Sequence, residues 1–197
     1  MGAKINGFDK YYSLDSEIQA FTVDKLSNAV TRIIDRLARD EEIFKLLYFE
    51  DDRALGNNLN DNKIAMEVFK NGEIAKSKNV NQRITPYPFN PNVQETHQAF
   101  IRVYFNQGTI DKAGYTSKNQ VNIDIIVSHS LWLTSDPESK LRLIRPYAIM
   151  SRVIDVLESE KIDKLPVPTG FNHLTVNEHF ECIRIYANLI STEKEGE

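Results

Sequence analysis

The longest regular pattern in the sequence is an alternation of apolar and polar residues between Gln120 and Leu133. The apolar set is Val121, Ile123, Ile125, Val127 and Leu131. The polar set is Asn122, Asp124, Ser128 and Ser130. Successive side chains of a strand point to opposite faces, so a period of two over this length predicts one long strand. We expect its apolar face to cover a core and its polar face to meet solvent.

Two further segments predict partners for this strand. Ala99–Gln107 also alternates, and residues 172–177 and 180–191 have the pattern of a closing hairpin. Residues 108–119, which join the first two strands, are too many for a tight hairpin turn. They predict either an extended hairpin tip or a flexible loop that projects from the sheet. The strands together indicate a mostly antiparallel sheet.

Apolar residues at three- and four-residue spacing predict helices that flank this sheet. One helix is expected from Thr22, its candidate N-cap, to about residue 37. A second is expected over Glu41–Tyr48, with Asp40 as its cap. The run Asp136-Pro137-Glu138 is typical of a helix start. That third helix is expected to break or restart near Arg145-Pro146, because an interior proline removes a hydrogen bond.

Long segments outside these elements are expected to act as arms. They are an N-terminal arm (1–21), a proline-containing extended arm (71–96), the projecting loop (108–119) and a frayed acidic tail (192–197). Aromatic side chains on the first three are candidate anchors for a neighbouring subunit or partner: Tyr11, Tyr12, Tyr87, Phe89 and Tyr115. Trp132 ends the long strand and is either a lid on the local core or an interface anchor.

Composition is that of one ordinary globular domain. The 197 residues are 41% hydrophobic and 26% charged, which predicts a single α+β domain over 1–197. A formal net charge of −4 argues against a basic nucleic-acid coat. The single cysteine, Cys182, cannot form an internal disulfide, which favours a reducing compartment. No apolar run approaches the roughly 20 residues that span a bilayer, so we expect no membrane partner.

Few residues are arranged for catalysis. The histidines are scattered and lack the spacing of a zinc site: His97, His129, His173 and His179. Cys182 lies in a predicted strand among apolar residues, as a buried, inert thiol would. Asp124 and Asp111 leave open a Mg²⁺-dependent nuclease, against the alternative of an ordinary solvent-facing aspartate.

Three arginines of the third helical region have a similarly ordinary interpretation. Arg142, Arg145 and Arg152 alternate with acidic residues, which predicts a solvated, salt-bridged helix face. They could also touch phosphate or acids on a partner. The sequence therefore predicts a protein that is not an enzyme, with no catalytic, cofactor-binding or metal-binding residues and no cofactor.

Three segments in order carry a family resemblance. Asp40–Phe49 (DEEIFKLLYF) follows an amphipathic helix, Val121–His129 (VNIDIIVSH) forms a long alternating strand, and Leu141–Met150 (LRLIRPYAIM) begins a helix before a closing strand. This layout, over residues 22–191, resembles that of tailed-bacteriophage tail terminator and neck (head–tail joining) proteins. The resemblance is one of layout, without a diagnostic motif.

The resemblance implies a virion structural protein without catalytic residues. Its subunits are expected to form a ring, a hexamer, that caps the tail tube and joins it to the head connector. The implied partners are other copies of the chain, the tail tube protein and head connector or neck proteins, with DNA passing through unbound. The implied location is the tail or neck of a virion assembled in the host cytoplasm. The alternatives are another neck or tail-completion protein and the nuclease.

Overall fold

The computed structural model describes residues 21–57, 83–86, 98–110, 115–159 and 166–189. Four of the candidate anchors lie outside these residues: Tyr11, Tyr12, Tyr87 and Phe89. So do the 192–197 tail, nearly all of the 1–21 arm and most of the 71–96 arm.

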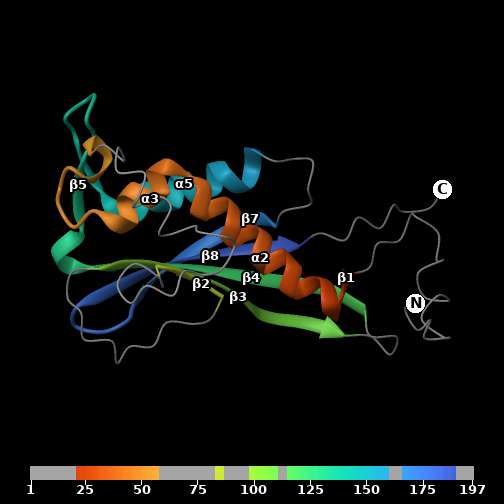
Figure 1. Ribbon diagram of the computed structural model, residues 1–197. Coiled ribbons are helices and arrows are strands. Elements are labelled where there is room, and N and C mark those ends of the chain that lie inside the picture. The colour runs from red at the N-terminus through yellow and green to blue at the C-terminus, as the bar shows by residue number, and fades with distance from the viewer. Residues whose placement is uncertain (1–20, 58–82, 87–97, 111–114, 160–165, 190–197) are drawn as a thin grey trace, which may run out of the picture.

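The main element is a twisted, mostly antiparallel sheet (Figure 1). Its strand order is β2-β3-β4-β8-β7, from Ile84–Thr85, Ala99–Ile110, Tyr115–Ser128, Phe180–Leu189 and Val167–Thr175 respectively. The short strand β1 (Phe21–Thr22) pairs with the start of β4, and β2 is parallel to β3. A separate hairpin pairs β5 (Leu133–Ser135) with β6 (Arg142–Ile144).

Three helices lie on one face of the sheet (Figure 1). They are α2 (Val23–Arg39), α3 (Glu41–Tyr48) and α5 (Arg145–Ser159), and the 3₁₀ turns η1 (Ala54–Gly56) and η3 (His129–Leu131) accompany them. Asp40 caps α3 as predicted, because its Oδ1 accepts a hydrogen bond from the Ile43 amide at 3.0 Å. The α+β class and the flanking helices are confirmed.

The core lies between the sheet and these helices. The apolar face predicted for β4 is confirmed, because all five side chains are buried there: Val121, Ile123, Ile125, Val127 and Leu131. Alternate residues of β8, Ile183 and Ile185, continue this layer, and Ile33 and Leu37 of α2 close it from above. Burial of this continuous apolar layer is the main source of the fold's stability.

The polar face of β4 is not solvent-facing, and that prediction is wrong. Asn122, Asp124 and Ser128 are all buried. The reason is a second set of side chains on the face away from the helices. Tyr104 on β3 and Arg184 on β8 reach toward each other across β4, and their side chains bond at 2.9 Å. This bridge lies over Asn122 and Asp124, which are their cross-strand neighbours.

The long strand is also shorter than predicted at its C-terminal end. It stops at Ser128, whose side chain accepts a hydrogen bond from the Ser130 amide and caps η3. The chain then turns before β5, so Leu131 reaches the core from a 3₁₀ turn rather than from a strand.

The helix predicted at Asp136 is a turn. Asp136 Oδ1 accepts hydrogen bonds from the Glu138 and Ser139 amides at 2.8 and 3.3 Å, which also lowers the pKa of Asp136. Lys140 has a φ of 56°, and the chain reverses there into β6. The predicted restart is confirmed, because α5 begins at Arg145 with Pro146 in its first turn. A proline there leaves no broken hydrogen bond.

Of the segment 108–119, residues 108–110 and 115–119 are described, and they continue the sheet. The β3–β4 ladder runs on through the pairs Gly108↔Asn119, Thr109↔Lys118 and Ile110↔Thr116. Of the two alternatives, the extended hairpin tip is the one observed. Tyr115 starts β4, and its side chain lies outside the described set. The closing hairpin is confirmed as β7–β8, although β7 begins at Val167, before the predicted start of its first strand at residue 172.

Candidate functional site

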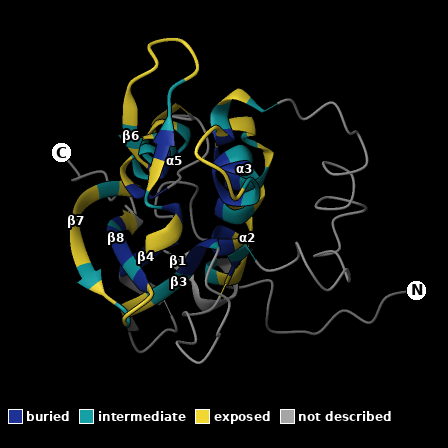
Figure 2. Ribbon diagram, turned by 90° about the vertical axis from the view of Figure 1, so that its left-hand side faces the viewer, coloured by how far each residue is buried: buried dark blue, intermediate teal, exposed yellow. Residues whose placement is uncertain are grey.

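The large apolar side chains that the core leaves exposed fall into two groups. One group lies on the β5–β6 hairpin and the start of α5: Leu133, Leu141, Ile144 and Tyr147. The other lies on β7, the edge strand of the sheet: Val167 and Phe171. Figure 2 shows the hairpin tip and β7 largely in the colour of exposed residues. Exposed apolar patches of this kind mark binding surfaces.

The hairpin is held against the turn after α3 by a main-chain hydrogen bond near its own turn. The Ser135 amide donates to the Asp52 carbonyl at 2.6 Å, and Thr134 is fully buried beside it. At the base of the hairpin, the Arg145 amide donates to the Trp132 carbonyl at 2.8 Å, which joins its two strands. The inner face is therefore fixed to the body of the protein, which leaves the outer face for a partner.

Arg145 secures the same region from inside. Its side chain is 0% exposed, and the guanidinium donates to the carbonyls of Leu46, Phe49 and Asp51. Burial lowers the pKa of Arg145, although Asp51 and Asp52 act in the opposite direction. The prediction of a solvated arginine face is wrong here, because carbonyl groups at the end of α3 require a buried donor. Arg152 does form ion pairs, as predicted for a salt-bridged face, but its shortest one, at 2.7 Å, is with Asp40, the cap of α3.

The outer face of the hairpin combines apolar side chains with a positive charge. Leu133 and Ile144 are cross-strand partners, 44% and 41% exposed. Arg142 lies two residues before Ile144 and therefore on the same face. Leu141, just outside the strand, is 64% exposed. We call Leu133, Ile144 and Arg142 the hairpin face.

Trp132 lies where the hairpin meets β7. Its ring stacks on His173 with centroids 6.0 Å apart, and it meets His129 edge-on at 6.1 Å. It also packs against the main core, as the lid interpretation predicts. A role for Trp132 as an interface anchor stays a prediction.

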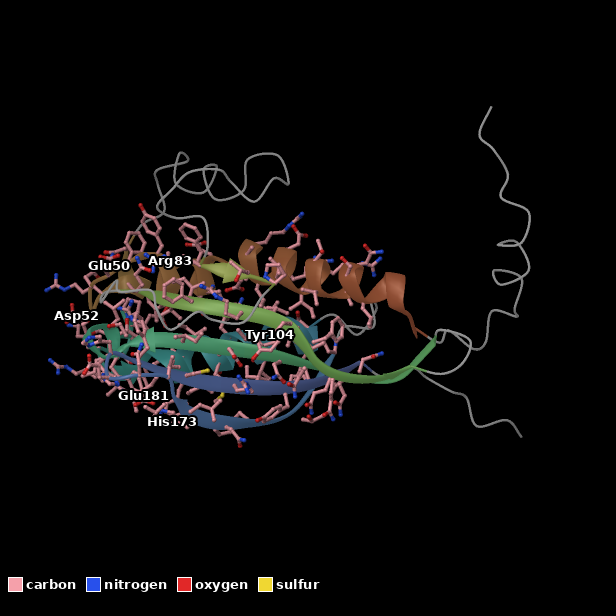
Figure 3. All side chains as sticks on the ribbon, turned by 90° about the horizontal axis from the view of Figure 1, so that it is seen from below. Glu50, Asp52, Arg83, Tyr104, His173 and Glu181 are labelled. Carbon is pink, nitrogen blue, oxygen red and sulfur yellow. The ribbon has the colours of Figure 1, made fainter. Side chains whose placement is uncertain are left out.

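Glu181 joins the two histidines beside Trp132. Its Oε1 lies 3.4 Å from His129 Nε2, and its Oε2 lies 3.3 Å from His173 Nε2. Figure 3 shows His173 and Glu181 next to each other near one end of the sheet. Phe171, which is 53% exposed, is on the same face of β7 as His173, because both pair with core-facing residues of β8. We call Phe171, His173 and Glu181 the β7 rim.

A cavity of about 390 Å³ lies between the hairpin, the 3₁₀ turn η3 and the turn after α3. Its walls carry both signs of charge: Glu50, Asp51 and Asp52 against Arg142 and Arg145. Glu50 pairs with Arg83 at 3.5 Å, and Asp51 accepts hydrogen bonds from Arg53 and Asn57 of its own loop. These carboxylates stabilise the loop that supports the hairpin.

The face of the sheet away from the helices carries an interlocked polar cluster. Asp124 binds Arg184 through both oxygens, at 2.7 and 2.8 Å, and also accepts from the Tyr104 hydroxyl at 2.8 Å. Burial, with help from Asp124, raises the pKa of Tyr104 to about 12. The hydrogen bond to Asp124 raises the pKa of Arg184. Figure 3 looks onto this face, with Tyr104 near the middle of the sheet.

This cluster uses the carboxylate that the nuclease alternative required. A Mg²⁺ ion would have to displace Arg184 or Tyr104 from Asp124, and Asp111 lies outside the described residues. Within the ranges that the structure describes, no three His, Cys, Asp or Glu side chains are grouped to hold a metal ion. Cys182 is buried as predicted, and burial raises the pKa of its thiol to about 12.

Sequence reasoning found Trp132 but missed the residues around it. Phe171 directly precedes the predicted hairpin, at a position where no periodicity shows its exposure. Arg142 was assigned to a helix face together with Arg145, although one is exposed on a strand and the other is buried. The contact of Trp132 with His173 joins residues far apart in the chain, and no local pattern indicates it.

In a comparison with known protein families, a family model described as YomW matches residues 40–189 of the chain. No curated protein and no solved structure matches. Among the described helices, none has the length and apolar character needed to cross a membrane.

Proposed function

The chain belongs to the YomW family, which is of phage and prophage type, and from this premise we propose that it is a virion structural protein. In this proposal it is a tail terminator or neck ring subunit. It caps the tail tube and joins the tube to the head connector, in the neck of a virion assembled in the host cytoplasm.

The observation that carries the proposal is that the exposed large apolar side chains of the described residues form two groups, one on the hairpin with the start of α5 and one on β7. A subunit of a closed ring touches its two neighbours through two different surfaces. The hairpin group and the β7 group supply two such surfaces on a subunit whose sheet–helix core is otherwise well packed. Permanent interfaces of this kind are rich in apolar anchors.

The proposal names the partners as further copies of the chain, the tail tube protein and the head connector or another neck protein. We expect the ring to be a hexamer that lets DNA pass without specific binding. The acidic net charge of −4 is compatible with such passage, because phosphates are not held by an acidic wall.

The test is the mass and shape of the purified protein. Size-exclusion chromatography with mass measurement, alone and with purified tail tubes, should give a closed oligomer, and electron microscopy should show rings at one end of the tubes. A protein that stays monomeric even with tubes present contradicts the proposal. Rings that bind the connector but never the tube would instead indicate another neck or tail-completion protein.

A further inference from the structure

The hairpin face carries an apolar pair beside a positive charge. Leu133 and Ile144 form the pair, and Arg142 follows the same face one two-residue repeat away. Two residues along a strand span roughly 6.6 Å. Within the described part of the chain, Arg142 makes no ion pair. Its guanidinium is therefore available to a carboxylate on a partner.

The β7 rim carries an exposed apolar group and a negative charge. Phe171 is its exposed apolar group. One two-residue repeat further along β7, the ring of His173 lies 3.3 Å from the Glu181 carboxylate. In the described ranges, neither lysine nor arginine pairs with Glu181, whose partners are the two imidazoles and the Thr175 hydroxyl. Glu181 is the ladder partner of Thr175, so its carboxylate lies beyond His173 from Phe171, on the neighbouring strand.

We propose that the hairpin face of one copy of the chain docks on the β7 rim of the next copy. Leu133 and Ile144 cover Phe171, and Arg142 pairs with Glu181. This inference rests on the proposed function and names the junction of its ring. A contact between two different patches is heterologous, so each copy binds one neighbour through its β7 rim and another through its hairpin face. A charged pair next to the apolar anchors fixes the register of the contact.

Two single variants block the two sides of this junction separately. Ile144→Glu places a negative charge on the hairpin face, and Phe171→Glu places one on the β7 rim. Each should remain folded by circular dichroism, because both side chains are exposed. Each should weaken self-association on the order of 30-fold, the loss expected for a central interface anchor. Asn28→Glu, an exposed position on α2, is the matched control and should form rings like the wild type.

Mixing the two variants tests whether the contact is heterologous. Ile144→Glu keeps an intact β7 rim, and Phe171→Glu keeps an intact hairpin face. Equal amounts should therefore form a 1:1 heterodimer that grows no further, as measured by light scattering after chromatography. Homodimers of either variant, or a mixture that stays monomeric, would overturn the inference.

A charge exchange tests the ion pair. Arg142→Glu and Glu181→Lys should each impair ring formation, and the double variant should restore it, because every junction then regains one opposite-charge pair. No restoration contradicts the pairing of Arg142 with Glu181. If all four single variants still form rings, this junction is wrong and the proposed function is unaffected. If the wild type stays monomeric with tail tubes present, the proposed function itself is wrong.

Discussion

At the scale of single residues, the face of the sheet away from the helices is defined by polar side chains that pair with one another. Asp124 gives both oxygens to Arg184 and one of them also to Tyr104, from positions 60 and 20 residues away in the chain. Sequence alternation identified the position of Asp124 but assigned it to solvent. Its burial depends on two partners on neighbouring strands, and nothing in the local pattern of β4 encodes them.

Removing the carboxylate of Asp124 should destabilise the fold. Asp124→Ala leaves Arg184 without its counter-charge in a part-buried site, so we expect the free energy of unfolding to fall by about 2–3 kcal/mol. Urea denaturation followed by circular dichroism measures this. Asp155→Ala on α5, whose side chain is 61% exposed, is the control and should stay within about 0.5 kcal/mol of wild type. An equally small change for Asp124→Ala would contradict the assigned role.

Tyr104 should make stability depend on pH in the alkaline range. Its pKa is about 12 in the fold against 10.0 for a free tyrosine, so the folded state holds the proton more tightly than the unfolded state. The resulting stabilisation is complete below pH 10 and is lost as the pH rises from 10 to 12.

Absorbance titration of tyrosinate should therefore show one late step near pH 12 that Tyr104→Phe removes. Denaturation at pH 9 and pH 11 should show a larger loss of stability for wild type than for Tyr104→Phe. An early titration of all tyrosines near pH 10 would argue against the hydrogen-bonded cluster.

At the scale of elements, periodicity predicted the strands and their core face, whereas the junctions between elements were harder to predict. The helix expected at Asp136 is a turn because the Asp136 side chain bonds the next amides before a helix can propagate. For residues 108–119 the sequence leaves a hairpin tip and a projecting loop as alternatives, and the described part of this segment contributes three paired positions to the β3–β4 ladder. Deleting it whole would therefore shorten the sheet and not merely remove a loop.

Arg145 is the residue that holds the elements around the hairpin together. Arg145→Met should lower the free energy of unfolding by about 3 kcal/mol or more, because three carbonyls lose a buried donor. Arg145→Lys should recover only part of this, since one ammonium group lacks the planar fork that reaches all three. Thermal and urea unfolding measure both.

The control for these variants is Arg32→Ala, at an exposed position on α2, which should leave stability within about 0.5 kcal/mol of wild type. A fully stable Arg145→Met would show that solvent or a neighbouring group can satisfy the three carbonyls.

At the scale of the whole molecule, the sequence indicates an α+β fold and a resemblance to phage proteins. The fold class is confirmed, and the family is of phage and prophage type. The surfaces that carry the proposed assembly were not predictable in the same way. Trp132 can be singled out because it is the single tryptophan of the sequence. Phe171 and Arg142 become candidate interface residues only because they are exposed, and their exposure depends on how the edge strand and the hairpin pack on the folded protein.

Assembly should make thermal stability depend on protein concentration. A ring that forms only from folded subunits stabilises them by mass action, so the Tm of the wild type should rise with concentration. Phe171→Glu should weaken that dependence, because its self-association is weaker, while leaving the Tm at high dilution unchanged. Differential scanning calorimetry over a roughly hundredfold range of protein concentration measures this dependence of the Tm. A wild-type Tm that does not vary would count against the ring.

The anchoring of the hairpin by Ser135, Thr134 and Arg145 affects the thermodynamics of association as well as its geometry. A free flap of this length would lose conformational freedom on meeting a neighbour, and that loss would oppose binding. The hairpin of this protein has already lost that conformational freedom when the single subunit folds. The hairpin meets its partner preorganised, so more of the contact energy remains to hold the complex together.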